Sequence, residues 1–510
     1  MEPEKNRRKR LIKNTFFLYV RMLFVMAISI YTSRVVLDKL GVVDFGIHSI
    51  VGGMTSMFIF FRSSLSNASQ RFISVALAKG DSAITQKTFC IHQTLYIFLA
   101  ICVVIVVEIV GLWLLNNKLV IPQERMNAAF WSFQFMVVSL VVTLLSIVYD
   151  ALIIAHENMK IYSYVGIFEG CAKLGIAYML AIANFDRLVF YSALLFGVAL
   201  CIRIFYAIYC KKKYVECRFK LTWDRKDVQE ASSIVGWNLI GTAVWTINNQ
   251  GIDILLNMFF GPVVNAAKAI ATQVDRNVNN FVNNFFVAVQ PQMTKSYVSG
   301  DFAYLTKLFY ASSRYSFFML WFLCLPIMLC IDTILKIWLK QVPENAGVFV
   351  NLILAYSLIN VLNNPIWSVI LAVGKLKKYI CIGSGVFLLS FPLSYIFLKK
   401  GCDAAFVLVI NDVVRAIYIL VVLNIIKKYI PITFLHYVKN VFIPIFAVIG
   451  ASGIFSLFLR TYTTNTLLDE FILGGSAVIV NSLCILFMGL NKVERKVLLT
   501  TVQKRIFMHA

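Results

Sequence analysis

The sequence predicts an all-α membrane protein that crosses the bilayer about 14 times, in two six-helix lobes related by a pseudo-twofold axis and two further C-terminal helices. Of its 510 residues, 60% are hydrophobic and 14% are charged, whereas soluble chains carry about 25% charged residues. Apolar stretches of about 20 residues, each long enough to cross a hydrocarbon core about 30 Å thick, recur along nearly the whole chain. A pattern from the first half also recurs in the second.

The apolar stretches divide the chain into spans joined by short connections. We expect spans at 14–34, 44–66, 91–115, 128–150, 161–183, 188–210, 234–257, 265–290, 312–338, 348–371, 379–398, 404–426, 440–459 and 470–490. The longest connection is charged and follows the sixth span. We therefore predict an N-terminal lobe over 1–210, a cytoplasmic linker over 211–233, a C-terminal lobe over 234–427, and two additional helices with a basic tail over 428–510.

The distribution of positive charge predicts the orientation. The formal net charge of +23 would suggest nucleic-acid binding in a soluble protein. Membrane proteins, however, retain Lys and Arg on the cytoplasmic side. With the N-terminus inside, cytoplasmic segments hold 29 Lys and Arg and external segments hold 10. We expect a multi-pass membrane protein with both termini cytoplasmic and no nucleic-acid partner.

Residues 41–81 and 261–301 resemble each other at a constant offset, and both blocks end on Gly-Asp. The matched pairs are Gly41/Gly261, Val43/Val263, Ile50/Ile270, Phe61/Phe281, Ala68/Ala288, Gln70/Gln290, Gly80/Gly300 and Asp81/Asp301. A second echo joins 153–162 to 370–379. Six spans separate the copies, so both enter the membrane in the same direction, as in a parallel repeat of an alternating-access transporter. Chance likeness between apolar helices is the alternative.

Charged residues at membrane depth are candidates for function, because each costs at least about 2.5–3.5 kcal/mol unless it meets water or a partner. The cations there are Arg21, Arg62, Lys173, Arg203, Lys268, Arg276, Arg314 and Arg415. The acids are Glu108, Asp150, Glu169, Asp253, Asp275 and Asp412. Cations outnumber acids, which favours an anionic cargo.

The span at 265–290 gathers polar side chains on one arc and valines and phenylalanines on the other. Such a helix lines an aqueous cavity or lies on a membrane surface, and the spans on either side favour the cavity. The span at 44–66 has a similar, broader polar side. We predict a cationic substrate cavity formed by Arg21, Arg62, Lys268 and Arg276, with polar lining from Ser66, Asn67, Gln70, Gln273, Asn277, Asn280 and Asn284. Arg21 also lies close enough to the inner interface to snorkel there.

The acids at depth have two interpretations, as ion-coupling groups or as structural partners. Asp253 and Asp275 are the candidates for Na⁺ or H⁺ coupling, and for Asp253 a salt bridge to a neighbouring helix is the alternative. Glu169 with Lys173, and Asp412 with Arg415, are spaced as structural pairs.

Nothing in the sequence indicates catalysis. The five histidines show no catalytic spacing, no zinc-type H-E-x-x-H occurs, and the eleven cysteines form no C-x-x-C. We therefore expect neither an enzyme, nor a metal site, nor a cofactor.

The stretches "NTFFLYVRML", "LGVVDFGIHSIVGG", "SNASQRFISVALAKGD" and "FVAVQPQMTKSYVSGD" resemble those of bacterial polysaccharide exporters. This family includes the O-antigen and lipid-linked oligosaccharide flippases of the multidrug/oligosaccharidyl-lipid/polysaccharide exporter superfamily. The resemblance covers about 10–490. It implies a V-shaped, MATE-like pair of lobes and a cationic lumen for the pyrophosphate and sugars of an undecaprenyl-linked repeat unit.

The function that we predict is therefore transfer of a lipid-linked oligosaccharide across the inner membrane by alternating access. The expected partners are that substrate, membrane lipids and other membrane proteins of polysaccharide assembly. A cation-coupled multidrug or metabolite antiporter of the same fold is the alternative. The multidrug branch relies on carboxylates in its first helices, whereas here Arg21 and Arg62 occupy membrane depth, and guanidinium groups match phosphate oxygens.

Overall fold

The computed structural model describes residues 4–56, 81–156, 158–182, 184–218, 248–373, 376–461 and 466–491, with short pieces at 65–66, 69–70, 72–74, 76–77, 220, 244, 246 and 494–496. Side chains are described from Phe24 onward, apart from those at 159, 162, 284, 287, 288, 291 and 376–378. The regular secondary structure in these residues is helical, with no strand among them. The predicted all-α class is confirmed.

Contacts divide the chain into two compact units. The first unit is Met1–Ala269 with Leu339–Glu344, and the second is Ile270–Trp338 with Asn345–Ala510. Helix α8 (Pro262–Val298) begins in the first unit and continues in the second. The predicted lobe and linker boundaries stay predictions.

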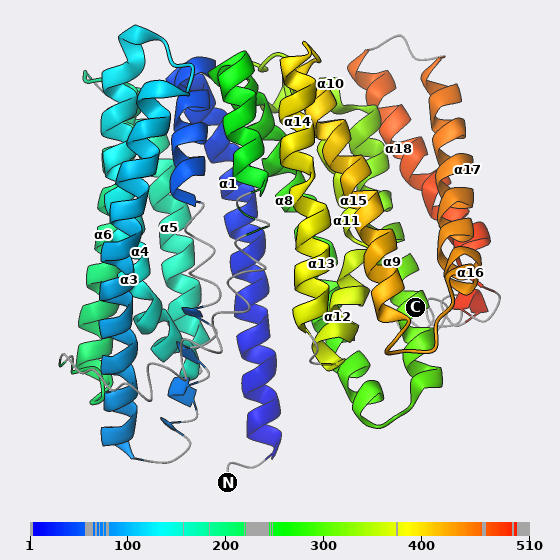
Figure 1. Ribbon diagram of the computed structural model, residues 1–510, viewed down its shortest axis with the longest axis horizontal. Helices are drawn as coiled ribbons and strands as arrows, with labels where there is room; N and C mark the ends of the chain where they lie inside the picture. The colour runs from blue at the N-terminus through cyan, green and yellow to red at the C-terminus, as the bar shows by residue number, and fades with distance from the viewer. Residues whose placement is uncertain are drawn as a thin grey trace. The chain divides into compact units, whose positions relative to one another are not determined.

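The first unit is a helical bundle built around α4 (Figure 1). Its helices are α1 (Glu4–Ser56), α3 (Ser82–Asn117), the 3₁₀ turn η1 (Gln123–Arg125), α4 (Met126–Ala155), α5 (Met159–Met179) and α6 (Arg187–Lys213). Helix α4 packs between α3 and α6, and α1 packs against α5. The Phe133 ring is fully buried and lies so close to Gly111 that a Cβ there would overlap it. A residue without a side chain thus allows α3 and α4 to meet.

The second unit continues from α8 through α9 (Phe302–Leu329), α10 (Ile331–Trp338), α11 (Ala346–Asn360), α12 (Asn363–Val373), α13 (Leu376–Leu388), α14 (Ser390–Lys399) and α15 (Ala404–Ile426). It ends with α16 (Phe434–Tyr437), the π turn η2 (Val438–Phe442), α17 (Ile443–Arg460), α18 (Leu467–Cys484) and the π turn η3 (Ile485–Gly489). Helices α17 and α18 pack on α9. There the Trp321 indole donates to Ser452, and Asn481 donates to the Trp321 carbonyl.

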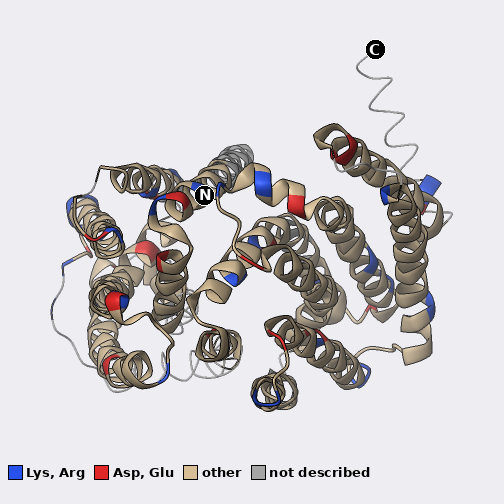
Figure 2. Ribbon diagram, turned by 90° about the horizontal axis from the view of Figure 1, so that it is seen from above, with Lys and Arg blue, Asp and Glu red and all other residues tan. Residues whose placement is uncertain are grey.

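Nine helical stretches in the described part of the chain are long and apolar enough to cross a membrane. They coincide with nine predicted spans, beginning with α3 and ending with α18 and η3. Helices α1, α5 and α8 coincide wholly or in part with four other predicted spans, of which 44–66 is described as helix up to Ser56. The remaining predicted span, 234–257, is described only in its final part. Charged residues are sparse on the helices seen in Figure 2.

Local backbone geometry supports the internal repeat. The matched residues Gly41 and Gly261 both have positive φ, 80° and 77°, which a side chain would strain. The matched residues Asp81 and Asp301 both cap a helix: Asp81 accepts from the Ala83 N–H at the start of α3, and Asp301 accepts from the Tyr304 N–H at the start of α9. The repeated aspartate thus begins the third helix of each group of six.

A further matched pair shows that the likeness extends along the chain. Asp186 and Asp403 differ by the offset that relates 153–162 to 370–379. Asp186 caps α6 by accepting from the Leu188 and Val189 N–H groups, and Asp403 caps α15 by accepting from the Ala404 N–H. The last helix of each group of six therefore also begins in the same way.

The beginning of the predicted linker is packed against the first unit. The Tyr214 ring stacks on His156 at 4.1 Å between ring centroids. His156 Nε2 lies 2.6 Å from Glu216 Oε1, and Cys217 is buried. The chain after α6 is thus attached to the end of α4.

Candidate functional site

Helix α8 reproduces the two predicted faces in part, because its buried valines lie on the apolar arc but Phe281 of the same arc is exposed. Val278 and Val282 are buried in the second unit, whereas Arg276 is exposed. Gln273, Asn277 and Asn280 are half-buried. A continuous polar face thus runs beside a buried apolar one.

Arg276 is available to a ligand. Its guanidinium forms no ion pair or hydrogen bond within the described residues, although Asp275 is its neighbour in sequence. An unneutralised guanidinium presents two parallel N–H groups that match the oxygens of a phosphate. Arg276 is therefore an anion-binding candidate on a polar helix face.

The Asp275 carboxyl group is hydrogen-bonded to residues other than the adjacent Arg276. Its Oδ1 accepts a short hydrogen bond from the Ser357 hydroxyl on α11 and a bond of 2.8 Å from the Asn279 amide. Asn279 also donates to the Ser357 hydroxyl at 3.0 Å. All three groups belong to the second unit. Two neutral hydrogen-bond donors thus fix the orientation of this carboxyl group.

Lys268 and Asp253 form an ion pair in the first unit. Lys268 Nζ lies 2.7 Å from Asp253 Oδ1, and both side chains are largely buried, with 11% and 25% of their surface exposed. In this state each residue neutralises the other. Of the two predicted cavity cations with described side chains, only Arg276 forms no ion pair within the described residues.

Asparagines fix the backbone around this pair. Asn257 accepts from the Val120 N–H at 2.9 Å and donates to Asn265 at 3.0 Å. Asn265 donates in turn to the Asp253 carbonyl at 2.9 Å. Both amides are almost fully buried. This network holds the helix that carries Asp253 against the first turn of α8.

Several predicted site residues are only partly described. Arg62 and Asn67 lie outside the described residues, as do the side chains of Arg21 and Asn284. Ser66 and Gln70 are described and half-buried. A cavity lined jointly by these residues stays a prediction. Within the described residues, no group of three or more His, Cys, Asp and Glu is placed to hold a metal ion.

The two predicted structural pairs differ in outcome. Lys173 and Glu169 are paired at 2.6 Å, which confirms the first. The second is wrong: no ion pair joins Asp412 to Arg415 among the described residues. Arg415 instead donates a short hydrogen bond to Asn360 on α11 and lies 4.2 Å from the Tyr418 ring centroid. The packing of α11 on α15 brings the half-buried Asn360 amide within reach of Arg415, and α15 itself supplies the ring of Tyr418.

A three-residue ion cluster at the ends of predicted spans was missed from the sequence. Arg125 on η1 donates to both carboxylate oxygens of Asp44 on α1, at 2.8 and 2.6 Å. It also donates to both oxygens of Asp186, at 2.5 and 3.1 Å. The only signal for this cluster in the sequence is that one arginine and two acids lie near the ends of predicted spans.

The chain is similar in structure to transporters. Lipid II flippase MurJ in an inward closed conformation has a TM-score of 0.66 and 13% identity, covering 92% of this chain and 98% of that chain. An inward-facing multidrug resistance MATE family transporter of the MOP superfamily has a TM-score of 0.61 and 11% identity. The match covers 80% of this chain and 95% of that chain. A point mutant of the Vibrio cholerae MATE transporter VcmN has a TM-score of 0.54 and 14% identity. The match covers 82% of this chain and 96% of that chain.

These structures show the fold that the sequence predicts, a MurJ- and MATE-like helical membrane protein. No protein-family model and no curated protein matches the sequence. The likeness to these structures therefore establishes the fold alone.

Proposed function

We propose that this chain is a flippase that moves an undecaprenyl-pyrophosphate-linked oligosaccharide, the repeat unit of an O-antigen, capsule or exopolysaccharide, across the inner membrane. The observation that carries the proposal is Arg276, an exposed guanidinium on a polar helix face that forms no ion pair or hydrogen bond within the described residues. Similarity to a lipid II flippase supports a lipid-linked substrate. The excess of cations over acids at membrane depth supports an anionic one.

In the proposed mechanism, the pyrophosphate enters from the cytoplasmic side and is held by Arg276, with Arg21 and Arg62 as further cations. The amides of Gln273, Asn277 and Asn280 then face the sugars. The polyprenyl tail remains in the bilayer, and the two lobes alternate access to the headgroup. Both chain termini stay in the cytoplasm.

The proposal is tested by transport of a fluorescent undecaprenyl-pyrophosphate oligosaccharide in proteoliposomes. Arg276→Ala should lower the rate at least about tenfold, because a charge-assisted hydrogen bond contributes about 1.5–3 kcal/mol. Arg276→Lys should retain part of the activity, since lysine keeps the positive charge but lacks the planar fork of N–H donors that a guanidinium group presents. Lys295→Ala, an exposed cation in the last turn of the same helix, is the matched control. Wild-type transport by folded Arg276→Ala would overturn the role of Arg276.

Cation-coupled export of a small molecule is the second candidate function. The MATE transporters of similar fold support it, as does the carboxyl group of Asp275 held by two neutral donors. The same proteoliposomes distinguish the two. Efflux of a cationic dye driven by a Na⁺ or H⁺ gradient, with no movement of the lipid-linked sugar, would favour the antiporter.

A further inference from the structure

The second unit contains a pocket where α15 ends and the next membrane helix begins. Its volume is about 480 Å³, within the range of sites that hold a small organic ligand. The last three turns of α15 form one wall, and the connection at 432–433 and helix α16 form the other. No predicted substrate or ion-coupling residue lines it.

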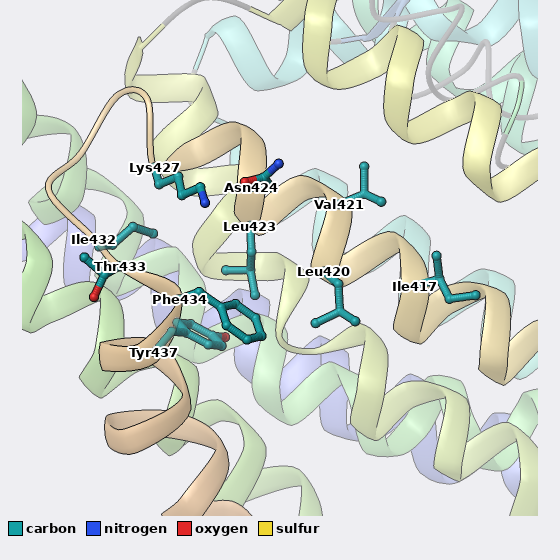
Figure 3. A pocket seen from close by; sticks show the side chains of 10 residues that line it. All are labelled: Ile417, Leu420, Val421, Leu423, Asn424, Lys427, Ile432, Thr433, Phe434 and Tyr437. Atoms are coloured by element: carbon teal, nitrogen blue, oxygen red, sulfur yellow. The ribbon is translucent and has the colours of Figure 1, made fainter.

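The pocket has an apolar end and a polar end (Figure 3). Ile417 and Leu420 lie along α15 at one end, and both side chains are exposed. Asn424 and Lys427 lie together at the other end. Leu423 and Phe434 line the pocket between its two ends. A ligand that fits must therefore also be apolar at one end and polar at the other.

The length of the apolar wall matches one leaflet of a bilayer. Ile417 and Lys427 are ten residues apart, which corresponds to about 15 Å along an α-helix. The hydrocarbon core is about 30 Å thick, so this wall extends from its surface to about its middle. The connection at 427–439, which begins at the polar end, is cytoplasmic in the predicted topology. The leaflet concerned is thus the cytoplasmic one.

The charge at the polar end is positive and unneutralised. Lys427 is exposed and forms no ion pair within the described part of the chain. Lys428 and Lys439 lie in the same connection. Cytoplasmic leaflets carry anionic lipids that attract such lysines. Near the same end, Phe434 and Leu435 are exposed, as expected of side chains that enter a bilayer.

We propose that this pocket binds an anionic glycerophospholipid of the cytoplasmic leaflet. One acyl chain lies over Ile417, Leu420 and Leu423, and the phosphate meets the Lys427 ammonium and the Asn424 amide. The lipid fills the space between α15 and the start of the following helix. This inference requires only that the chain spans a membrane and is independent of the transported substrate.

Native mass spectrometry of the full-length protein, titrated with phosphatidylglycerol, tests the inference. Lys427→Gln should weaken binding about fivefold, the change produced by a contribution of about 1 kcal/mol per lysine near an anionic lipid surface. Lys428→Gln is the matched control, because the adjacent lysine does not line the pocket. Leu420→Trp should occlude the apolar end and remove the bound lipid. Val413→Trp, an exposed position two turns earlier on α15, should leave binding unchanged.

Three results of these binding experiments would overturn the proposal. Equal binding of phosphatidylethanolamine and phosphatidylglycerol would show that charge does not select the occupant. Displacement of phosphatidylglycerol by undecaprenyl phosphate at lower concentration would assign the pocket to the carrier lipid. Equal effects of the two lysine substitutions would reduce the interaction to general attraction by the connection. Thermal unfolding of each variant identifies any loss of binding that follows from misfolding.

Discussion

Lys268 Nζ and Asp253 Oδ1 lie 2.7 Å apart, so the acid that the sequence offers for ion coupling is neutralised by a cation that the sequence offers for substrate binding. Two functional predictions thus meet in one ion pair. In this state Asp253 accepts a proton or a metal cation only if Lys268 is released.

A charge-swapped pair separates the structural role from ion coupling. Asp253→Asn and Lys268→Met should each lower the free energy of unfolding by about 2–4 kcal/mol, because each leaves a largely buried charge without its partner. The double variant Asp253→Lys/Lys268→Asp should recover most of this loss. Thermal unfolding in detergent measures stability, and proteoliposomes measure transport. Recovery of stability without transport would show that transport needs the acid and the cation at their native positions, whereas recovery of neither would contradict the pair.

A second prediction concerns the approach of α1 to the first residue of α8 in the first unit. A Cβ placed on Gly46 would overlap the Pro262 carbonyl oxygen, which is backbone and yields little. Gly46→Ala should therefore destabilise the protein by about 2 kcal/mol or more, as over-packing does. Gly175→Ala on α5 is the control, since no atom lies within 4 Å of its Cβ. It should stabilise the helix by about 0.5–1 kcal/mol. Equal effects in thermal unfolding would contradict the close approach.

The spans could be predicted because a bilayer requires each to be long and apolar. The glycine and aspartate of the repeat were also visible in the sequence, although only the structure shows what they do: Gly300 has positive φ and Asp301 caps α9. The bond between Asp275 and Ser357, 82 positions apart, was not predictable, because the packing of α8 against α11 decides which polar residues meet. For the same reason the i, i+3 spacing of Asp412 and Arg415 predicted the wrong partner.

Arg125 supports a third prediction. Its guanidinium contacts both oxygens of Asp44 and both oxygens of Asp186, which also caps α6. Lysine has the charge but not the fork, so Arg125→Lys should lose most of the contribution of this cluster, about 1–3 kcal/mol for hydrogen bonds to charged groups. Thermal unfolding measures the loss. Arg187→Lys, which changes a single hydrogen bond to a backbone carbonyl, should cost less. A larger loss from Arg187→Lys would show that the fork of Arg125 is not what joins α1 to α6.

The fourth prediction concerns pH. Asp38, in the connection between the first two predicted spans, accepts from Lys340 Nζ at 2.9 Å, although the two residues are 302 positions apart. This hydrogen bond holds the pKa of Asp38 below its ordinary value of 3.8. A carboxyl group whose pKa is lowered by folding stabilises the folded state above the ordinary pKa. That contribution is lost as the pH falls through the lowered value.

Asp38→Asn and Lys340→Gln should therefore both be less stable than the wild type at pH 6, and the difference should shrink as the pH falls below 3.8 through the lowered pKa of Asp38. The difference should be at most about 1 kcal/mol, because Lys340 is 56% exposed and solvent screens the pair. High salt should reduce it further. Lys336→Gln is the matched control, since Lys336 has no ion pair among the described residues. Thermal unfolding between pH 6 and pH 3 measures the effect. A stability difference that persists at low pH would mean that the Asp38 carboxylate is not what binds Lys340, and that the contact between 339–344 and α1 depends on other groups.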